Sequence, residues 1–288
     1  MKTILLVLLI MLLTSCGSAR MIELSGKASL KGVEVSQQAL EVFDLLSQQA
    51  DIDKLQQDKV KILTHPNPSA MPLPDTKTQD FSKQIVPRIK AYQSLLNTYK
   101  AFGLLTDNQF GEKTREAFAS LQESYNAIEK LPDLPATVSD KLPEVAKMVL
   151  QSIQAKKIKK HNLVLYNLSQ LYLTLWNEDQ KIWNDYIDLI YNTYASGLNT
   201  VDSKRFDIEK IKSESKEPFS DEAIVVLLYR LNYRNEILKQ RNTVKKQLSD
   251  FGKALSELNQ VHAEIAKTKT NISDVTSLLN SIENMLKQ

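Results

Sequence analysis

The chain has 288 residues, of which 42% are hydrophobic and 25% are charged. This composition is that of an ordinary folded protein and excludes a disordered stalk. Its 37 basic and 34 acidic side chains leave a formal net charge of +3, which is too balanced to indicate nucleic acid as a partner.

The first segment is a short apolar leader that ends at the only cysteine of the chain. Lys2 gives the leader a positive start, residues 4–13 are uninterrupted hydrocarbon, and two small residues separate this run from Cys16. The run of about ten residues is well short of the ~20 that a membrane-spanning helix needs. Because a lone cysteine cannot form an internal disulfide, Cys16 is either incidental or a site of covalent attachment. The alternatives to attachment are an uncleaved anchor and a plain secretory signal with a chance cysteine.

The four residues Leu-Thr-Ser-Cys that end at Cys16 resemble the lipobox of bacterial lipoprotein signal peptides. The resemblance implies that residues 1–15 are removed as a signal peptide and that Cys16 is acylated with palmitate. In that family, a residue other than Asp after the cysteine is typical of export to the outer membrane of a Gram-negative cell, and Gly17 stands there. The implied location is therefore the cell envelope, at the outer membrane and facing the periplasm. Residues 16–33 are polar and contain glycines, which predicts a lipidated tether.

Residues 34–135 are expected to form an N-terminal helical region. Apolar residues at helical spacing predict a first helix over 34–64, which a cluster of prolines ends. A second helix is predicted over 80–102, with Pro87 near its start or at a kink, and a third is predicted over 111–130.

The connection between the second and third predicted helices carries a distinct motif, Asp-Asn-Gln-Phe-Gly, with a threonine three residues later. Over residues 89–122 the chain resembles the type 1 peptidoglycan-binding domain, a small three-helix module. The resemblance implies peptidoglycan as a partner. The candidate ligand-binding residues are Asp107, Asn108, Phe110, Gly111 and Thr114. These residues also fit a plain helical corner, because Asp107 can accept backbone hydrogen bonds in a turn and Gly111 permits close backbone approach.

Residues 136–288 are expected to form a long helical hairpin. Its first arm is predicted to begin near Pro143 and to end at Gly197. The apolar residues of this arm fall into two sets, so its apolar face is wide and needs more than one partner helix. The first set is Leu165, Leu168, Tyr172, Leu175, Ile182, Tyr186 and Leu189, and the second is Leu171, Trp176, Trp183, Ile187, Ile190 and Tyr194. The aromatic members indicate bundle core, with a ligand box as the alternative.

The second arm is predicted as one helix over 221–286. From Val244 to Leu286 the seam residues recur at every third or fourth position, as in a coiled coil, and all are apolar except Thr268. Gly252 and residues 268–273 are the weak points, since each lowers helix propensity. Because no strand-like alternation occurs, the predicted fold is all-α, an elongated helical bundle with a long antiparallel coiled-coil hairpin.

No residue pattern in the sequence indicates catalysis, a metal or a cofactor. His65, His161 and His262 stand far apart and lack partners at metal-ligand spacing. Four carboxylates of the aromatic helix lack the Glu-x-x-His pairs of a di-iron bundle, so we expect them on a solvated face or in a polar layer. They are Glu178, Asp179, Asp185 and Asp188. With no phosphate-binding loop or nucleophile motif either, the expectation is a protein that is not an enzyme.

These observations predict a membrane-anchored lipoprotein of the cell envelope with a structural or adaptor role. The membrane would be contacted through the lipid on Cys16, peptidoglycan through residues 107–114, and protein partners through the C-terminal coiled coil. The alternative is a helical interaction subunit of an export, toxin or surface complex.

Overall fold

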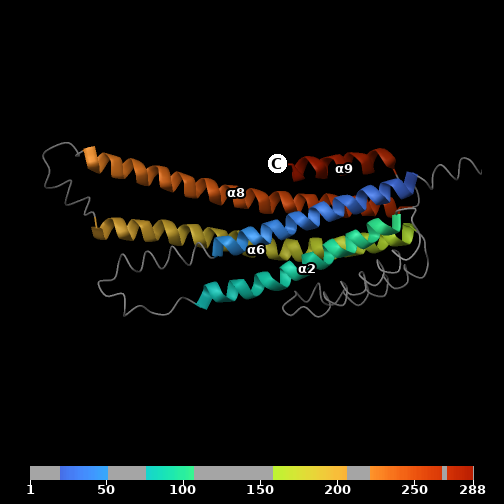
Figure 1. The fold of residues 1–288 in the computed structure, drawn as a ribbon, viewed down its shortest axis with the longest axis horizontal. Helices are drawn as coiled ribbons and strands as arrows, with labels where there is room; N and C mark the ends of the chain where they lie inside the picture. The colour runs from blue at the N-terminus through green and yellow to red at the C-terminus, as the bar shows by residue number, and fades with distance from the viewer. Residues whose placement is uncertain (1–19, 51–75, 107–157, 206–220, 268–270, 288) are drawn as a thin grey trace, which may run out of the picture. The chain divides into compact units, whose positions relative to one another are not determined.

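The computed structural model describes residues 20–50, 76–106, 158–205, 221–267 and 271–287. These residues form five helices and no strand, which confirms the predicted all-α helical bundle (Figure 1). One helix covers residues 20–50, and the others are α2 (Thr76–Thr106), α6 (Ile158–Arg205), α8 (Asp221–Ala266) and α9 (Ile272–Leu286). No helix in the described part of the chain is both long and apolar enough to cross a membrane.

The helices contribute to two compact units. The first unit takes its residues from Met1–Glu41, Pro87–Glu178 and Ser249–Gln288, and the second takes its residues from Val42–Val86 and Asp179–Leu248. Each unit is described by itself below.

The core of the first unit is built from aromatic side chains of α2, α6 and α8. Phe251 lies edge-on to Trp176, with ring centroids 4.6 Å apart, and edge-on to Tyr92 at 5.5 Å. The Tyr172 hydroxyl donates a hydrogen bond of 2.7 Å to the carbonyl of Ala91, which ties α6 to α2. All these aromatic rings are buried, so the predicted role of the α6 aromatics as bundle core is confirmed for this unit.

Within the first unit, α6 and α8 run antiparallel. The early α6 residue Asn162 meets His262 late in α8, whereas the later Trp176 meets the earlier Phe251. This agrees with the predicted direction of the hairpin arms.

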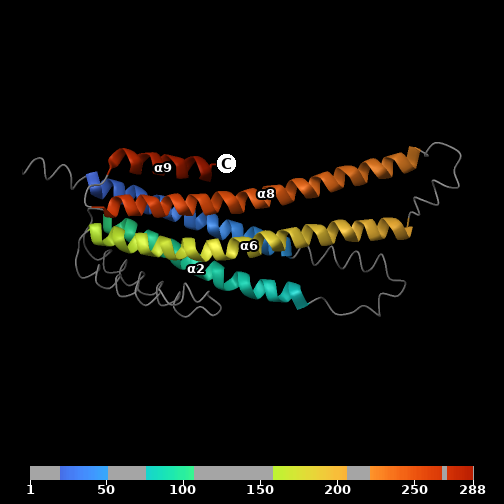
Figure 2. The same cartoon turned by 180° about the vertical axis from the view of Figure 1, so that it is seen from behind.

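The predicted single helix over 221–286 is wrong, because the chain reverses after Ala266. The side chain of Asn271 caps the start of α9 by accepting a hydrogen bond of 3.2 Å from the Ser273 amide. Ser281 donates to Glu257 at 2.9 Å, so α9 folds back along α8, as both views show (Figures 1 and 2). The reversal falls at the predicted weak point, and the apolar repeat continues on α9 because Val275, Leu279 and Ile282 are buried there.

Residues 20–33 are helical, so the tether predicted over 16–33 is corrected for these residues. Although the sequence of this segment is polar, one face of its helix is buried and carries mostly small side chains. Its buried members are Leu24, Ser25, Ala28, Ser29 and Gly32, and Val35 continues the row. Their spacing of three and four residues is that of one helix face.

One predicted helix end differs from the structure, because Gly197 lies inside α6, which continues to Arg205. Pro87 lies inside α2, so of its two predicted places the one near the start of the helix is excluded. A glycine inside a helix costs about 1 kcal/mol relative to alanine, which packing elsewhere along the helix can offset.

In the second unit, Trp183 of α6 lies edge-on to Phe43, with ring centroids 5.7 Å apart and an interplanar angle of 84°. The hydroxyl of Tyr191 donates to the Gln49 side chain at 3.1 Å. Both contacts join α6 to residues 43–49 of the first described helix, so α6 packs through its aromatic side chains around residues 183–191 as well.

The buried face of α6 in the second unit is formed by the second predicted apolar set. Trp183, Ile187 and Ile190 are buried there, whereas Ile182 and Leu189 of the first set are 48% and 53% exposed. The prediction that the first set is buried along its whole length is therefore wrong. A straight helix turns by about 20° per heptad relative to a strict seven-residue repeat, so a fixed set drifts off the core face over several heptads.

Candidate functional site

The site residues predicted from the sequence lie outside the described residues. Cys16 precedes the first described helix, and Asp107, Asn108, Phe110, Gly111 and Thr114 follow α2, which ends at Thr106. Lipid attachment and peptidoglycan binding at these positions therefore stay predictions.

The first unit contains a buried polar layer to which four helices each contribute one side chain. It consists of Ser25 of the helix over 20–50, Tyr99 of α2, Asn162 of α6 and His262 of α8. Asn162 Nδ2 donates to Ser25 Oγ at 2.7 Å, and Asn162 Oδ1 lies 3.4 Å from His262 Nδ1. The Tyr99 hydroxyl lies 3.1 Å from His262 Nε2.

The hydrogen-bond partners of His262 decide which ring nitrogen carries the proton. Asn162 presents its carbonyl oxygen, which can only accept, so Nδ1 of the imidazole must be the donor. Nε2 is then the acceptor for the Tyr99 hydroxyl. This assignment depends on the orientation of the Asn162 amide, in which Nδ2 faces Ser25 Oγ and Oδ1 faces the imidazole.

Burial keeps both ring systems of the layer uncharged. It lowers the pKa of His262 to about 3, so the imidazole is neutral at pH 7. Burial also raises the pKa of Tyr99 above its ordinary value, against a smaller opposing effect of a hydrogen bond with Ser169. A neutral imidazole that accepts from a protonated phenol is therefore the stable state of the pair.

A second buried group joins α6 to α8 in the same unit. Ser169 Oγ donates to Asn259 Oδ1 at 2.9 Å, and Asn259 Nδ2 donates to Gln170 Oε1 at 2.8 Å. Both oxygen and nitrogen of the Asn259 amide are thus satisfied.

These polar side chains align the helices. Shifting one helix by a turn would leave each buried group without its partner, at a cost of about 1–3 kcal/mol per group. Within the part of the chain that the structure describes, no cluster of three or more His, Cys, Asp or Glu side chains could hold a metal ion. We therefore interpret these buried polar side chains as residues that fix the register of the helices.

The sequence argued against metal ligation by His262, but the place of this residue in the bundle core was not predicted. A signal was present, because His262 follows Leu258 by four residues and precedes Ile265 by three, which is core spacing. Its partners Ser25 and Asn162 gave no comparable signal, since they belong to helices far away in the sequence.

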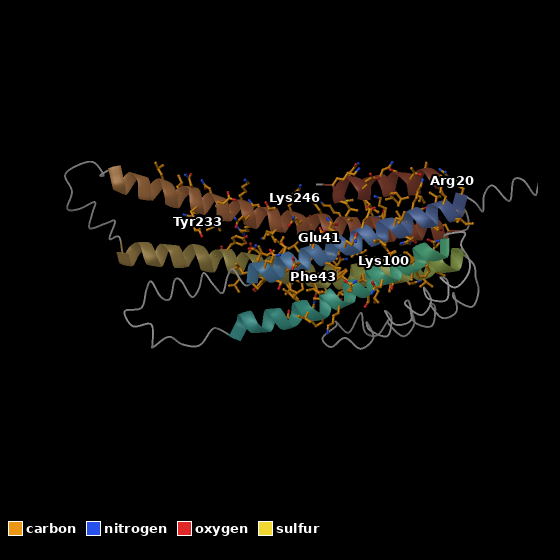
Figure 3. The ribbon with its side chains drawn as sticks, viewed as in Figure 1. Arg20, Glu41, Phe43, Lys100, Tyr233 and Lys246 are labelled. Carbon is orange, nitrogen blue, oxygen red and sulfur yellow. The ribbon has the colours of Figure 1, made fainter. Side chains whose placement is uncertain are left out.

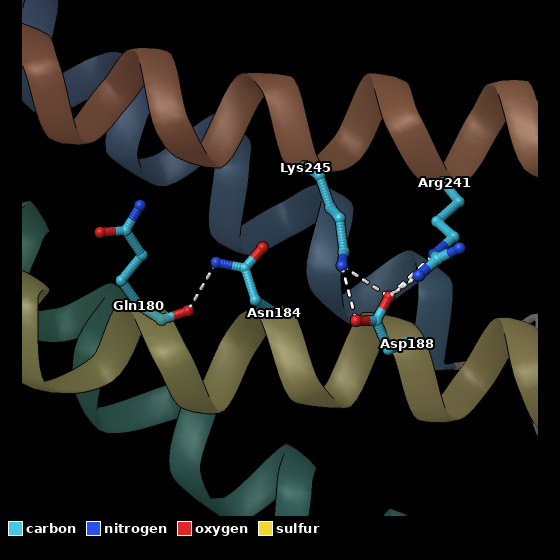
Figure 4. A network of polar contacts seen from close by, with 5 residues as sticks. All are labelled: Gln180, Asn184, Asp188, Arg241 and Lys245. Atoms are coloured by element: carbon cyan, nitrogen blue, oxygen red, sulfur yellow. Dashed lines mark hydrogen bonds and ion pairs between the residues drawn. The ribbon is translucent and has the colours of Figure 1, made fainter.

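Among the described residues of the second unit, charged side chains cluster between α6 and α8 (Figure 4). Asp188 of α6 accepts from Lys245 Nζ at 2.6 Å and from Arg241 Nε at 2.8 Å, and a further Arg241 nitrogen also contacts it. Partial burial works against the charged form, but donation by Lys245 and Arg241 outweighs it and holds the pKa of Asp188 below its ordinary value. The sequence predicted a solvated or polar-layer position for Asp188. In the structure its side chain is about a third exposed and forms ion pairs with both Arg241 and Lys245.

Comparisons of the chain with protein-family models, with curated proteins and with solved structures found no match.

Proposed function

We propose that the protein is a lipid-anchored structural or adaptor component of a bacterial cell envelope. The observation that carries the proposal is Cys16, the only cysteine, placed directly after an apolar leader of about ten residues and two small residues. Acylation there would hold the chain at a membrane, since each buried methylene of an acyl chain contributes about 0.8 kcal/mol.

We further propose that residues 107–114 bind peptidoglycan. In this view the lipid holds one partner, the outer membrane, and the Asp-Asn-Gln-Phe-Gly motif holds the other, the cell wall. A protein that binds both would connect the two layers and would need no catalytic group.

The anchor predicts covalent palmitate on Cys16. Cells grown with labelled palmitate are expected to yield a labelled wild-type protein, and Cys16→Ser is expected to carry no label because it removes the only thiol of the chain. Labelling is measured by autoradiography of the purified protein. Label that persists in Cys16→Ser would overturn the anchor.

The wall contact predicts co-sedimentation with purified peptidoglycan sacculi. The suitable protein begins at residue 16 and carries Cys16→Ser, which keeps every described residue and removes the acyl chain. We expect it to pellet with sacculi, and we expect the double variant Asp107→Ala with Phe110→Ala to lose at least about 1.4 kcal/mol of binding, which is tenfold in affinity. Pelleting that is absent, or unchanged in the double variant, would remove peptidoglycan from the proposal.

A further inference from the structure

The solvent-facing side of α8 in the second unit carries a row of exposed leucines. Leu228, Leu231 and Leu238 are 54%, 56% and 43% exposed. At 3.6 residues per turn, the three fall within about a quarter of the helix circumference. The opposite side of the same helix is buried through Ile237 and Val244, so the leucine row is a second apolar face and not part of the core.

Basic side chains flank this row along both edges. The helical repeat places Arg234, Arg241 and Lys245 along one edge and Lys239 and Lys246 along the other. Lys246 is labelled on α8 in Figure 3, and Arg241 and Lys245 reach from α8 to α6 in Figure 4.

This part of α8 has more basic than acidic side chains. Asp188 meets both Arg241 and Lys245, and Glu236 is the only acidic side chain within residues 231–248 of α8. Arg234 and Lys239 are exposed, so the surface around the leucine row is positively charged. An apolar strip with a basic border is the surface that an amphipathic helix presents to anionic lipid.

We propose that the side of α8 over residues 228–246 docks on the surface of an anionic bilayer. The leucines enter the boundary between headgroups and acyl chains, and the exposed cations Arg234, Lys239 and Lys246 contact lipid phosphates. The positive charge of this face favours an anionic bilayer over a second copy of the chain, because two such faces would repel each other. The inference rests on the proposed function for the nearness of a membrane, and it adds a second, non-covalent contact with that membrane.

The test is sedimentation with vesicles, using the protein that begins at residue 16 with Cys16→Ser. We expect binding to vesicles of phosphatidylglycerol and phosphatidylcholine at low salt, weak binding to pure phosphatidylcholine, and release at high salt. Arg234→Gln with Lys239→Gln should weaken binding about fivefold for each cation removed. Leu231→Ser with Leu238→Ser should weaken it as well, while circular dichroism stays unchanged because both side chains are exposed.

Leu189→Ser on α6 is the matched control, because Leu189 is as exposed as Leu231 but lies on another helix. We expect it to bind vesicles like the parent protein. Equal binding to neutral and anionic vesicles, or an equal loss in Leu189→Ser, would overturn the proposal. If light scattering shows that the parent protein is a dimer and that Leu231→Ser is a monomer, the face binds a second copy of the chain instead of a bilayer. The protein tested here carries no acyl chain, so the vesicle experiment and the palmitate labelling of Cys16 are independent. Absence of vesicle binding would not argue against the anchor, and absence of palmitate would not argue against vesicle binding by α8.

Discussion

Gly32→Ala is expected to destabilise the first unit by about 3 kcal/mol, whereas Gly103→Ala is expected to leave it unchanged or to stabilise it slightly. A Cβ atom at Gly32 would lie 2.2 Å from Cδ1 of Tyr99. The Tyr99 ring cannot withdraw easily, because it is buried and its hydroxyl is bonded to His262. The extra methyl group must therefore push the helix over 20–50 away from α2.

Gly103 provides the control because it is also helical and a Cβ there would meet no atom within 4 Å. Alanine in such a helix position is normally more stable than glycine by about 0.5–1 kcal/mol. The sign of the effect at Gly32 is thus opposite to the general rule, and the cause is packing alone.

The measurement is urea unfolding followed by the fluorescence of Trp176. The chain has two tryptophans, and Trp183→Phe removes the one in the second unit, so that Trp176 reports on the first unit. Both glycine variants are compared in this background. Equal unfolding midpoints for Gly32→Ala and Gly103→Ala would contradict the close approach of Gly32 to Tyr99.

His262→Gln is expected to remove most of the loss of stability that the first unit shows between pH 7 and pH 5. The pKa of His262 is lowered by burial to about 3, whereas in the unfolded chain it is about 6.5. Below pH 6.5 the unfolded chain therefore binds a proton that the folded chain does not. The free energy of unfolding then falls on acidification, by up to about 1.4 kcal/mol per pH unit, until the pH reaches the folded pKa.

The pH window from 7 to 5 separates this effect from the carboxylates, which bind protons mainly at lower pH. Glutamine keeps a polar group beside Tyr99 but cannot bind a proton in this range. We expect it to cost about 1–3 kcal/mol at pH 7 and to flatten the slope. The readout is again Trp176 fluorescence in urea, at several pH values. A slope that is the same with and without His262 would contradict the buried neutral imidazole.

The helical pattern predicted much of the fold, because apolar spacing reports directly on which residues a helix buries. The aromatics Trp176 and Trp183 are core residues as expected, and the predicted long helix is interrupted between Ala266 and Ile272, beside the predicted weak point. The reversal itself could not be read from the pattern, since the apolar repeat continues through the break.

Other features depend on which helices meet, and one sequence does not contain that information. Residues 20–33 look like a tether because the segment is polar and contains two glycines, yet one of these, Gly32, is what allows Tyr99 to approach the helix. The buried layer of Ser25, Asn162 and His262 likewise needs the register of three helices before its hydrogen bonds can be seen.

The central claim is that the chain is held at a membrane through Cys16. Its most direct test is mass spectrometry of the N-terminal peptide of the protein extracted from the membrane fraction of its host cells. The account predicts a peptide that begins at Cys16 and carries the added mass of acyl chains. A peptide that begins elsewhere, or that holds Cys16 as an unmodified thiol, would contradict it.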